Sequence, residues 1–282
     1  MRTHLLIVLT FSAVGCNSES PGEDEYFGPA PAAIGSSFSA SRCGRVEGRV
    51  TWLGDIPEPP AFLYCVPRPG GEGMTYLNAE NPNRPRIDPK SKAVEGAVVY
   101  LRGIDPARSR HWDHPAVRVE VGQGQIAVLQ GHRRGRVGFV QHGESFTARA
   151  TENQLHILRG RGHDYFSLAL PEIDRDITRV MPDKGRVELS SGTGQYWMRA
   201  DLFVTDHPYF TTTDADGRFA FDQVPDGPVE AVVWLPSWEV ASQERNPDTT
   251  AISTMTYRPA IERGRSLAVE AGKVTAAEFA LP

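Results

Sequence analysis

Histidine and cysteine are the residues of this chain with the clearest capacity for chemistry, because both bind transition metals and a thiolate is a nucleophile. The 282 residues include eight histidines and three cysteines. His111 and His114 are three residues apart, a spacing that can hold zinc or copper when further ligands converge. No Cys-x-x-Cys or His-Glu-x-x-His motif accompanies them. The pattern favours solvent-exposed loop histidines, as it does for His132, His142 and His163.

Nucleophilic and phosphate-binding motifs are absent from the sequence. There is no Gly-x-Ser-x-Gly elbow, and Ser190-Ser191-Gly192 is typical of a turn because no helical pattern follows it. The segment RGRG at 159–162 lacks the glycine spacing of a phosphate loop. We therefore expect a protein that is not an enzyme.

Charge excludes general nucleic-acid binding. The formal net charge is −5 at pH 7, although GHRRGR at 131–136 and RGRG at 159–162 are locally basic. A negative chain with short basic segments is typical of solvated loops rather than a nucleic-acid surface.

The first fifteen residues predict export. Arg2 precedes an apolar run at 5–14, which is too short to cross a bilayer and ends at Ala13-Val14-Gly15-Cys16. This segment is typical of a secretory signal peptide, and its end resembles a bacterial lipobox. The resemblance implies lipidation of Cys16, a membrane-anchored lipoprotein and a location in the bacterial cell envelope or periplasm; the alternative is ordinary cleavage. Residues 16–42 are rich in Ser, Gly, Pro and acids and predict a disordered tether.

Cys43 and Cys65 are the cysteines that remain after export. In an oxidising compartment an even pair favours a disulfide, which would close a loop of about twenty residues and contribute about 3 kcal/mol. Two buried free cysteines are the alternative, because spacing alone fixes no geometry.

Period-two alternation predicts an all-β chain of two β-sandwiches. Apolar residues alternate with polar ones at 45–53, 97–101, 117–121, 126–128, 137–139, 166–170, 187–189, 196–204 and 229–235, and again near the C-terminus at 267–269 and 274–281. The prolines in residues 54–92 predict a long irregular segment between strands. Residues 237–264 are polar and predict a second such segment. Asp214-Ala215-Asp216-Gly217 predicts a hairpin turn in which aspartate accepts hydrogen bonds from backbone amides.

Two resemblances refine this architecture. The segment TDADGRFAFDQVPDGPVEAVVW resembles the closing motif of carboxypeptidase regulatory-like domains, which are prealbumin-like sandwiches, and GRVEGRV at 44–50 resembles their opening. The segment WMRADLFVTDHPYF is similar to the last strand of cupredoxin-like domains of bacterial secreted proteins. Together they imply a cupredoxin-like Greek-key sandwich at 105–206, inserted between the two parts of a regulatory-like sandwich at 43–104 and 207–282.

The cupredoxin-like resemblance also implies positions for copper ligands. Type 1 copper requires two histidines, a cysteine thiolate and usually a weak axial methionine. The resemblance places His156 at the first histidine and Met198 at the axial position, but Gly192 stands for the cysteine and Gln195 for the second histidine. We therefore expect a vestigial site and no cofactor. Copper binding or electron transfer is the alternative.

The leading functional hypothesis is a non-enzymatic binding or structural module. Prealbumin-like sandwiches share their architecture with starch-binding-like domains, so a glycan is one expected partner and an envelope protein another. Sugar binding requires exposed flat rings, whereas two of the candidate rings, Trp197 and Trp234, alternatively cover the junction between the sandwiches. The candidate ligand-binding aromatics are Trp197, Trp234, Trp238 and Tyr209.

Overall fold

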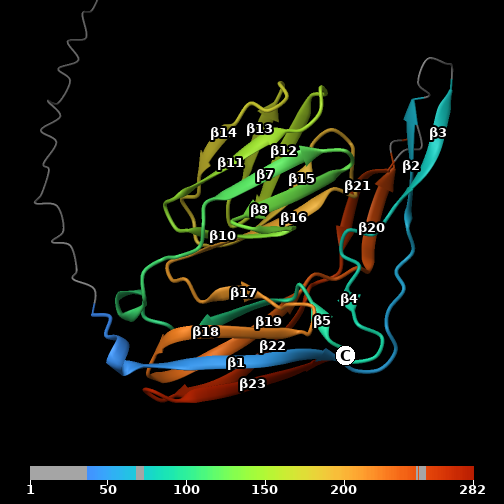
Figure 1. Cartoon of the computed structure of the whole chain (residues 1–282). Helices are drawn as coiled ribbons and strands as arrows, with labels where there is room; N and C mark the ends of the chain where they lie inside the picture. Colours follow the sequence, from blue (N-terminus) through green and yellow to red (C-terminus); the bar gives the residue numbers. More distant parts are fainter. Residues whose placement is uncertain (1–36, 68–72, 246, 248–251) are drawn as a thin grey trace, which may run out of the picture. The chain divides into compact units, whose positions relative to one another are not determined.

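Two pairs of β-sheets form most of the described chain, which confirms the predicted all-β sandwich class (Figure 1). The computed structural model describes residues 37–67, 73–245, 247 and 252–282, and residues 36–282 belong to one compact unit. Cys16, the signal segment and tether residues 16–36 lie outside the described residues. Among those described, no helix is long and apolar enough to cross a bilayer.

The first pair of sheets, which we call the terminal sandwich, uses strands from both ends of the described chain. A three-stranded sheet has the order β18-β1-β23, and a four-stranded sheet has the order β17-β6-β19-β22. Their inward-facing residues form one apolar core that includes Val46, Leu101 and Val233. The bounds are β1 Cys43–Trp52, β6 Val98–Arg102, β17 Phe210–Thr212, β18 Arg218–Pro225, β19 Gly227–Leu235, β22 Ile261–Val269 and β23 Val274–Leu281.

The second pair, which we call the central sandwich, is formed by the chain between β6 and β17. Its five-stranded sheets have the orders β10-β16-β15-β12-β13 and β14-β11-β7-β8-β9. A separate apolar core that includes Phe146, Leu158 and Leu202 lies between them. The bounds are β7 Val117–Gly122, β8 Gln125–Gln130, β9 Arg133–Gly135, β10 Val137–Gln141, β11 Ser145–Ala150, β12 His156–Gly162, β13 Phe166–Leu170, β14 Ile177–Val180, β15 Gly185–Ser191 and β16 Arg199–Thr205.

The predicted turn at Asp214 is confirmed. The Asp214 Oδ1 atom accepts backbone hydrogen bonds from Asp216 at 2.9 Å and from Arg218 at 2.7 Å. Gly217 has a φ of +74°, and a Cβ there would lie 2.4 Å from the Val50 carbonyl oxygen. Glycine is thus required both by the backbone conformation and by the close approach of β1.

Two hairpins occupy the stretches that the sequence predicts to be irregular. Strands β2 (Phe62–Pro67) and β3 (Met74–Ala79) pair within residues 54–92, and β20 (Val240–Arg245) pairs with β21 (Ile252–Tyr257) after Pro236. The prediction of irregular structure was wrong here because prolines and polar residues flank short runs of β-forming residues. Phe62 and Met255 join the core of the central sandwich, so both hairpins pack against it. The two-residue strands β4 (Arg86–Ile87) and β5 (Val94–Glu95) also pair.

The segment RGRG lies in strand β12 and not in the predicted loop. Gly160 is paired with Phe166 of β13, and a Cβ on Gly160 would lie 2.3 Å from the Phe166 ring. The ring therefore fills the space above the glycine, which restores apolar packing inside the sheet. This arrangement leaves Arg159 and Arg161 on the opposite, solvent-facing side of the strand.

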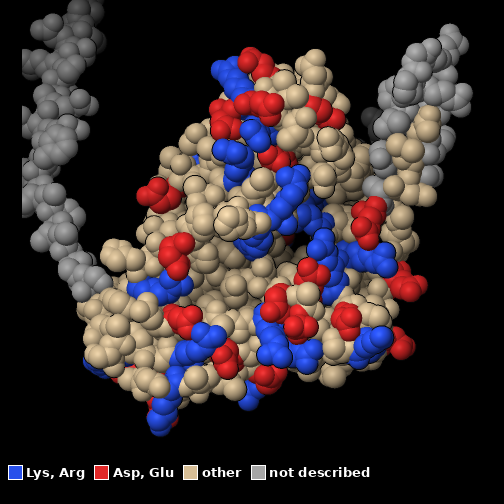
Figure 2. Space-filling view, viewed as in Figure 1, with Lys and Arg blue, Asp and Glu red and all other residues tan. Residues whose placement is uncertain are grey.

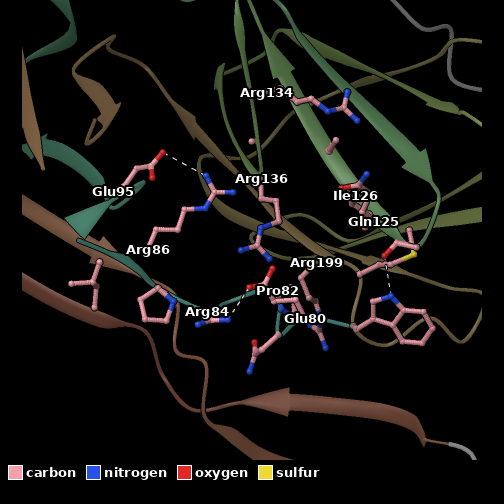
Figure 3. Close-up of a pocket in the computed structure, with 18 of the residues that line it drawn as sticks. Glu80, Pro82, Arg84, Arg86, Glu95, Gln125, Ile126, Arg134, Arg136 and Arg199 are labelled. Atoms are coloured by element: carbon pink, nitrogen blue, oxygen red, sulfur yellow. Dashed lines mark hydrogen bonds and ion pairs between the residues drawn. The ribbon is translucent and has the colours of Figure 1, made fainter. Parts of the chain in front are cut away.

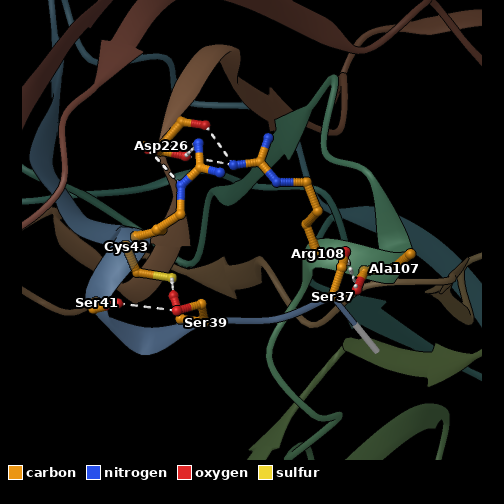
Figure 4. A network of polar contacts seen from close by, with 8 residues as sticks. Ser37, Ser39, Ser41, Cys43, Ala107, Arg108 and Asp226 are labelled. Carbon is orange, nitrogen blue, oxygen red and sulfur yellow. Dashed lines mark hydrogen bonds and ion pairs between the residues drawn. The ribbon is translucent and has the colours of Figure 1, made fainter. Parts of the chain in front are cut away.

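Cys43 carries a buried free thiol, so it does not form the predicted disulfide (Figure 4). Its Sγ donates to the Ser39 carbonyl at 3.2 Å, and burial together with nearby Asp226 raises the pKa of the thiol. The side chain of Cys65 lies outside the described residues, but Cys65 belongs to β2, which pairs with β3 and lies on the other side of the molecule from the start of β1 (Figure 1). Disulfide geometry requires Cα atoms within about 7 Å.

The last residues of the predicted tether are structured. Ala40–Arg42 form the short 3-10 helix η1, and the Ser37 amide donates to the carbonyl of Ala107, which lies in the 3-10 helix η2 (Pro106–Arg108). Arg42 and Arg108 both donate to Asp226 in the turn before β19 (Figure 4). These contacts fix residues 37–42 on the terminal sandwich.

Candidate functional site

The predicted copper positions His156 and Met198 are both buried. His156 begins β12 and is fully buried, its Nε2 lies 3.0 Å from Glu152 Oε1, and its Nδ1 has no partner among the described residues. Met198 is buried in the core of the central sandwich. Within the same part of the chain, no group of three or more His, Cys, Asp or Glu side chains could hold a metal ion. The loop histidines are likewise dispersed, and His142 contacts Asp206 and the Pro182 carbonyl instead.

Gly192 occupies a space too small for a side chain. Its amide donates to the Ile157 carbonyl at 2.7 Å, which places the loop between β15 and β16 beside the start of β12. A Cβ on Gly192 would lie 2.8 Å from Ile157 Cγ2 and 2.9 Å from Arg159 Nε. A cysteine in this position would have to displace both side chains, so the loop is fitted to glycine.

The predicted sugar-stacking aromatics are mostly buried. The exposed fractions of Trp197, Trp234 and Tyr209 are 8%, 5% and 0%. The Tyr209 hydroxyl donates to the Gln223 carbonyl at 2.6 Å, and Trp238 packs on Trp52 with ring centroids 5.7 Å apart. Buried rings cannot offer a face to a sugar, so the prediction of a stacking surface was wrong for Trp197, Trp234 and Tyr209, whereas Trp238 is partly exposed. The alternative role at the junction is correct for Trp234.

The two sandwiches meet through one apolar cluster. Val98, Phe210 and Trp234 of the terminal sandwich pack with Phe139 and Phe203 of the central sandwich. The Phe203 ring lies 5.3 Å from Trp234 and 6.1 Å from Phe210, measured between centroids. We call this set the junction cluster.

Beyond the junction cluster, the same face of the sheet carries polar residues, which lie in rows across β16, β15 and β12. Directly paired residues on adjacent strands share a face. Asp201 of β16 is paired with Glu188 of β15, which is paired with Arg161 of β12. The next row outward contains Arg199, Ser190 and Arg159.

Ion pairs and rings hold two arginines of this face. The Arg186 Nε donates to Asp201 at 2.8 Å, and the guanidinium lies 4.8 Å from the Trp234 ring centroid. Arg199 donates to Glu188 and to the Met255 carbonyl, and it lies 5.5 Å from the Tyr257 ring centroid. Burial raises the pKa of Tyr257 to about 12, so this ring stays neutral.

A cleft of about 950 Å³ opens beside these rows, and we call it the junction cleft (Figure 3). Its walls come from the β3–β4 connection, from β8 and from the loop before β16. Figure 3 shows Arg86, Arg136 and Arg199 around one hollow. Most of its arginines are paired, Arg86 with Glu95 at 3.5 Å and Arg134 with Glu120 at 2.7 Å.

Arg136 is the exception among the arginines that line the junction cleft. Its carbonyl accepts a hydrogen bond from the Asp201 amide at 2.8 Å, which fixes its backbone between β9 and β10. Its half-buried guanidinium makes no hydrogen bond or ion pair within the described part of the chain. Burial lowers the pKa of Arg136, Asp201 partly opposes this effect, and Arg86 adds to it. An arginine nevertheless keeps its charge in proteins, so an unmatched cation faces the cleft.

A second hollow of about 350 Å³ adjoins the first, and we call it the arginine groove. Arg199 lines both hollows. Arg159 and Arg161 line the arginine groove, are exposed, and form no ion pair within residues 37–67, 73–245 and 252–282. Figure 2 shows Lys and Arg atoms gathered in a band where Figure 1 places β15 and β16.

Sequence reasoning missed this arginine site. Arg136 and Arg159 are 23 positions apart, and only the sheet order β10-β16-β15-β12 brings the strand after Arg136 and the strand that contains Arg159 into one sheet. A local signal existed, because Arg159 and Arg161 alternate with glycines as residues of one strand face do.

No family model matches the chain, and no curated protein matches it. Two solved structures of amicyanin mutants, each with a proline replaced by glycine, are similar to part of the chain at a TM-score of 0.25 each. One is an oxidized form that is 13% identical and covers 32% of this chain and 81% of its own. The other is a reduced Cu(I) form that is 14% identical, with coverages of 38% and 97%. The copper belongs to amicyanin.

Proposed function

We propose that this chain is a non-enzymatic binding protein of the bacterial cell envelope, exported and anchored by a lipid on Cys16, with its ligand site in the junction cleft. The terminal sandwich would be of the carboxypeptidase regulatory-like type, as the segment TDADGRF suggests. The observation that carries the proposal is the guanidinium of Arg136, which makes no hydrogen bond or ion pair with a described residue and faces a cleft lined by the central sandwich and by the connection between β1 and β6.

Energetic reasoning supports a binding role for Arg136. Burying a charge without a counter-ion lowers stability, and natural interiors almost always pair such groups. A ligand that supplies the missing partner recovers that free energy on binding. Pockets at the interface of two structural units are also the usual positions of ligand sites.

The cleft chemistry favours binding over catalysis. Its lining consists of arginines, carboxylates, amides and apolar side chains, and no histidine, serine or cysteine of the described chain lines it. General acid–base or nucleophilic catalysis at neutral pH usually needs one of those groups or a strongly shifted carboxyl. We propose no cofactor, which elemental analysis of the purified protein would test.

Blocking the cleft tests the proposal. Gly135 lines the junction cleft, and a Cβ there would meet no atom within 4 Å. A G135W variant should therefore fill the cleft without disturbing the core. A panel of neutral and acidic oligosaccharides would be screened by calorimetry against the wild type, G135W and A280W, which adds the same ring to an exposed residue of β23.

We expect at least one panel member to bind the wild type and A280W, and to bind G135W about tenfold more weakly or not at all. Equal binding to all three proteins would move the site away from the junction cleft. No binding to any of them would argue against a glycan-binding module.

A further inference from the structure

Three arginines without partners among the described residues lie along the two adjoining hollows. Arg136 faces the junction cleft, and Arg159 and Arg161 face the arginine groove. Arg199 stands between them as part of both walls, held by Glu188 and Tyr257. The sites are therefore open to one ligand that extends from one hollow into the other.

The strand register gives the distances between the arginines that line the two hollows. Arg159 and Arg161 are alternate residues of β12, so their Cα atoms lie about 7 Å apart. Arg159 and Arg199 occupy the same cross-strand row with Ser190 between them, which separates their Cα atoms by about 10 Å. A single small anion cannot contact all these groups, whereas a chain with repeated anionic groups can.

Neutral groups between the arginines indicate what else the ligand carries. Asn83, Ser190, Ser191, Thr254 and Thr256 line the arginine groove. The hydroxyls of Ser190 and Thr254 make no hydrogen bond within the described residues. Short polar side chains of this kind suit a ligand rich in hydroxyls.

Each of the three aromatic rings that line the arginine groove already has a neighbour, and the Tyr196 ring packs against Phe62 and Trp197. The guanidinium groups of Arg186 and Arg199 already lie over Trp234 and Tyr257. Proteins that bind single-stranded nucleic acid rely on rings against which bases stack. Anionic groups and hydroxyls fit this surface better than stacked bases.

We infer that the ligand is an acidic oligosaccharide, with one carboxylate or sulfate on Arg136 and further anionic groups on Arg159 and Arg161. This inference rests on the proposed function. Guanidinium forks match such oxyanions through paired hydrogen bonds, and the groove hydroxyls would contact the sugar hydroxyls between them.

Oligogalacturonides test the inference, because their length and charge can be varied together. Binding of the monomer, trimer and hexamer to the purified protein would be measured by calorimetry at two salt concentrations. A neutral maltohexaose and a polyphosphate of equal charge complete the panel. The variants are R136Q, the double variant R159Q/R161Q, and R218Q as a matched control on an exposed arginine of β18 without an ion pair in the described structure.

We expect the hexamer to bind more tightly than the trimer, and added salt to weaken it. R136Q should weaken both by about tenfold, because each charged hydrogen bond contributes about that factor. R159Q/R161Q should weaken the hexamer and leave the trimer nearly unchanged, and R218Q should match the wild type.

Three outcomes would overturn the inference. Equal binding of maltohexaose would show that charge is not recognised, and equal binding of polyphosphate would show that the sugar is not. Binding of galacturonides that the R136Q change leaves intact would remove the anchoring group. If a neutral glycan binds and G135W blocks it, the cleft remains a binding site and only the ligand class fails.

Discussion

The junction between the sandwiches is aromatic at one end and rich in arginine at the other, although the same face of the sheet that contains β16 contributes to both ends. At one end Phe203 and Phe139 are in contact with Trp234 and Phe210 and are almost fully buried. At the other end Arg199 and Arg159 leave two hollows open. The two sandwiches pack closely against each other where the facing residues are aromatic, and they are separated by hollows where the facing residues are charged.

This difference leads us to expect that the aromatic end determines the stability of the fold and that the arginine-rich end takes part in binding. The junction cluster gains the free energy of burying large apolar rings, and each such ring contributes a few kcal/mol. The arginine rows gain little free energy from exposed ion pairs. Arg136 lowers stability, because its guanidinium makes no hydrogen bond or ion pair with a described residue and the nearby Asp201 offsets its burial only in part. We therefore expect substitutions at the apolar end to change folding, and substitutions at the charged end to change binding.

The largest expected effect is on Phe203. Its exposed fraction is 7%, and it contacts rings of both sandwiches. F203A should lower the free energy of unfolding by about 3 to 4 kcal/mol, because it leaves a cavity in the junction cluster. Urea denaturation would measure this, with Y165A at a residue that is 75% exposed as the control. Equal losses in both variants would contradict a packed junction.

The second prediction concerns pH at the apolar end. His207 lies 5.5 Å from the Phe210 ring, and burial lowers its pKa from 6.5 to about 4. The folded state therefore favours neutral imidazole, while the unfolded chain takes up a proton below about pH 6.5. Neutral His207 therefore makes its full contribution to the free energy of unfolding above pH 6.5. This contribution decreases as the pH falls toward 4, by at most about 3 kcal/mol.

Comparing the wild type with H207Q between pH 7 and pH 4 isolates this contribution, since other groups titrate in both proteins. The stability difference between the two proteins should narrow or reverse in favour of H207Q as the pH falls. Parallel curves would show that His207 keeps the same pKa in both states.

The third prediction is that removing one arginine stabilises the protein, whereas removing another destabilises it. R136M should raise the free energy of unfolding by about 1 kcal/mol, because it removes an unmatched charge and keeps a long side chain. R199M should lower it instead, because Glu188 would lose one of its two arginine partners and the Met255 carbonyl would lose its donor. Thermal and urea denaturation would measure both. A loss for R136M equal to that for R199M would reveal a structural role for Arg136.

The smallest expected effect is at Arg159. R159Q should leave the free energy of unfolding within about 0.5 kcal/mol of the wild type, since the side chain is exposed and unpaired within the described structure. The same denaturation experiment measures it. A clear loss would place Arg159 with the structural residues and weaken the division between the two ends.

The sequence predicted most strands because their faces alternate. Val46, Val50 and Trp52 of β1 and Val229, Ala231 and Val233 of β19 are buried as the pattern required. It did not predict the hairpins β2–β3 and β20–β21. Phe62 and Met255 are buried against the central sandwich, and no local pattern shows that partner.

The functional residues were harder to predict than the strands. The even pair of cysteines suggested a disulfide between Cys43 and Cys65, but Cys43 is a free thiol. Aromatic type suggested Trp234 as a ligand-binding residue, but its ring is buried. Both errors arise from judging residues by type without their neighbours. Arg136 is informative only because its guanidinium makes no hydrogen bond or ion pair in the described structure, and the partners of a charge depend on the tertiary fold.

The two connections between the sandwiches lie against each other. The His114 ring is 2.8 Å from the Pro208 carbonyl, and the Arg110 amide donates to the Tyr209 hydroxyl. The chain thus leaves the terminal sandwich and returns to it at one point, with some ninety residues of sheet between. Because β6 and β17 are paired next to this point, the central sandwich is a single insertion that leaves the strand order of its host sheet intact.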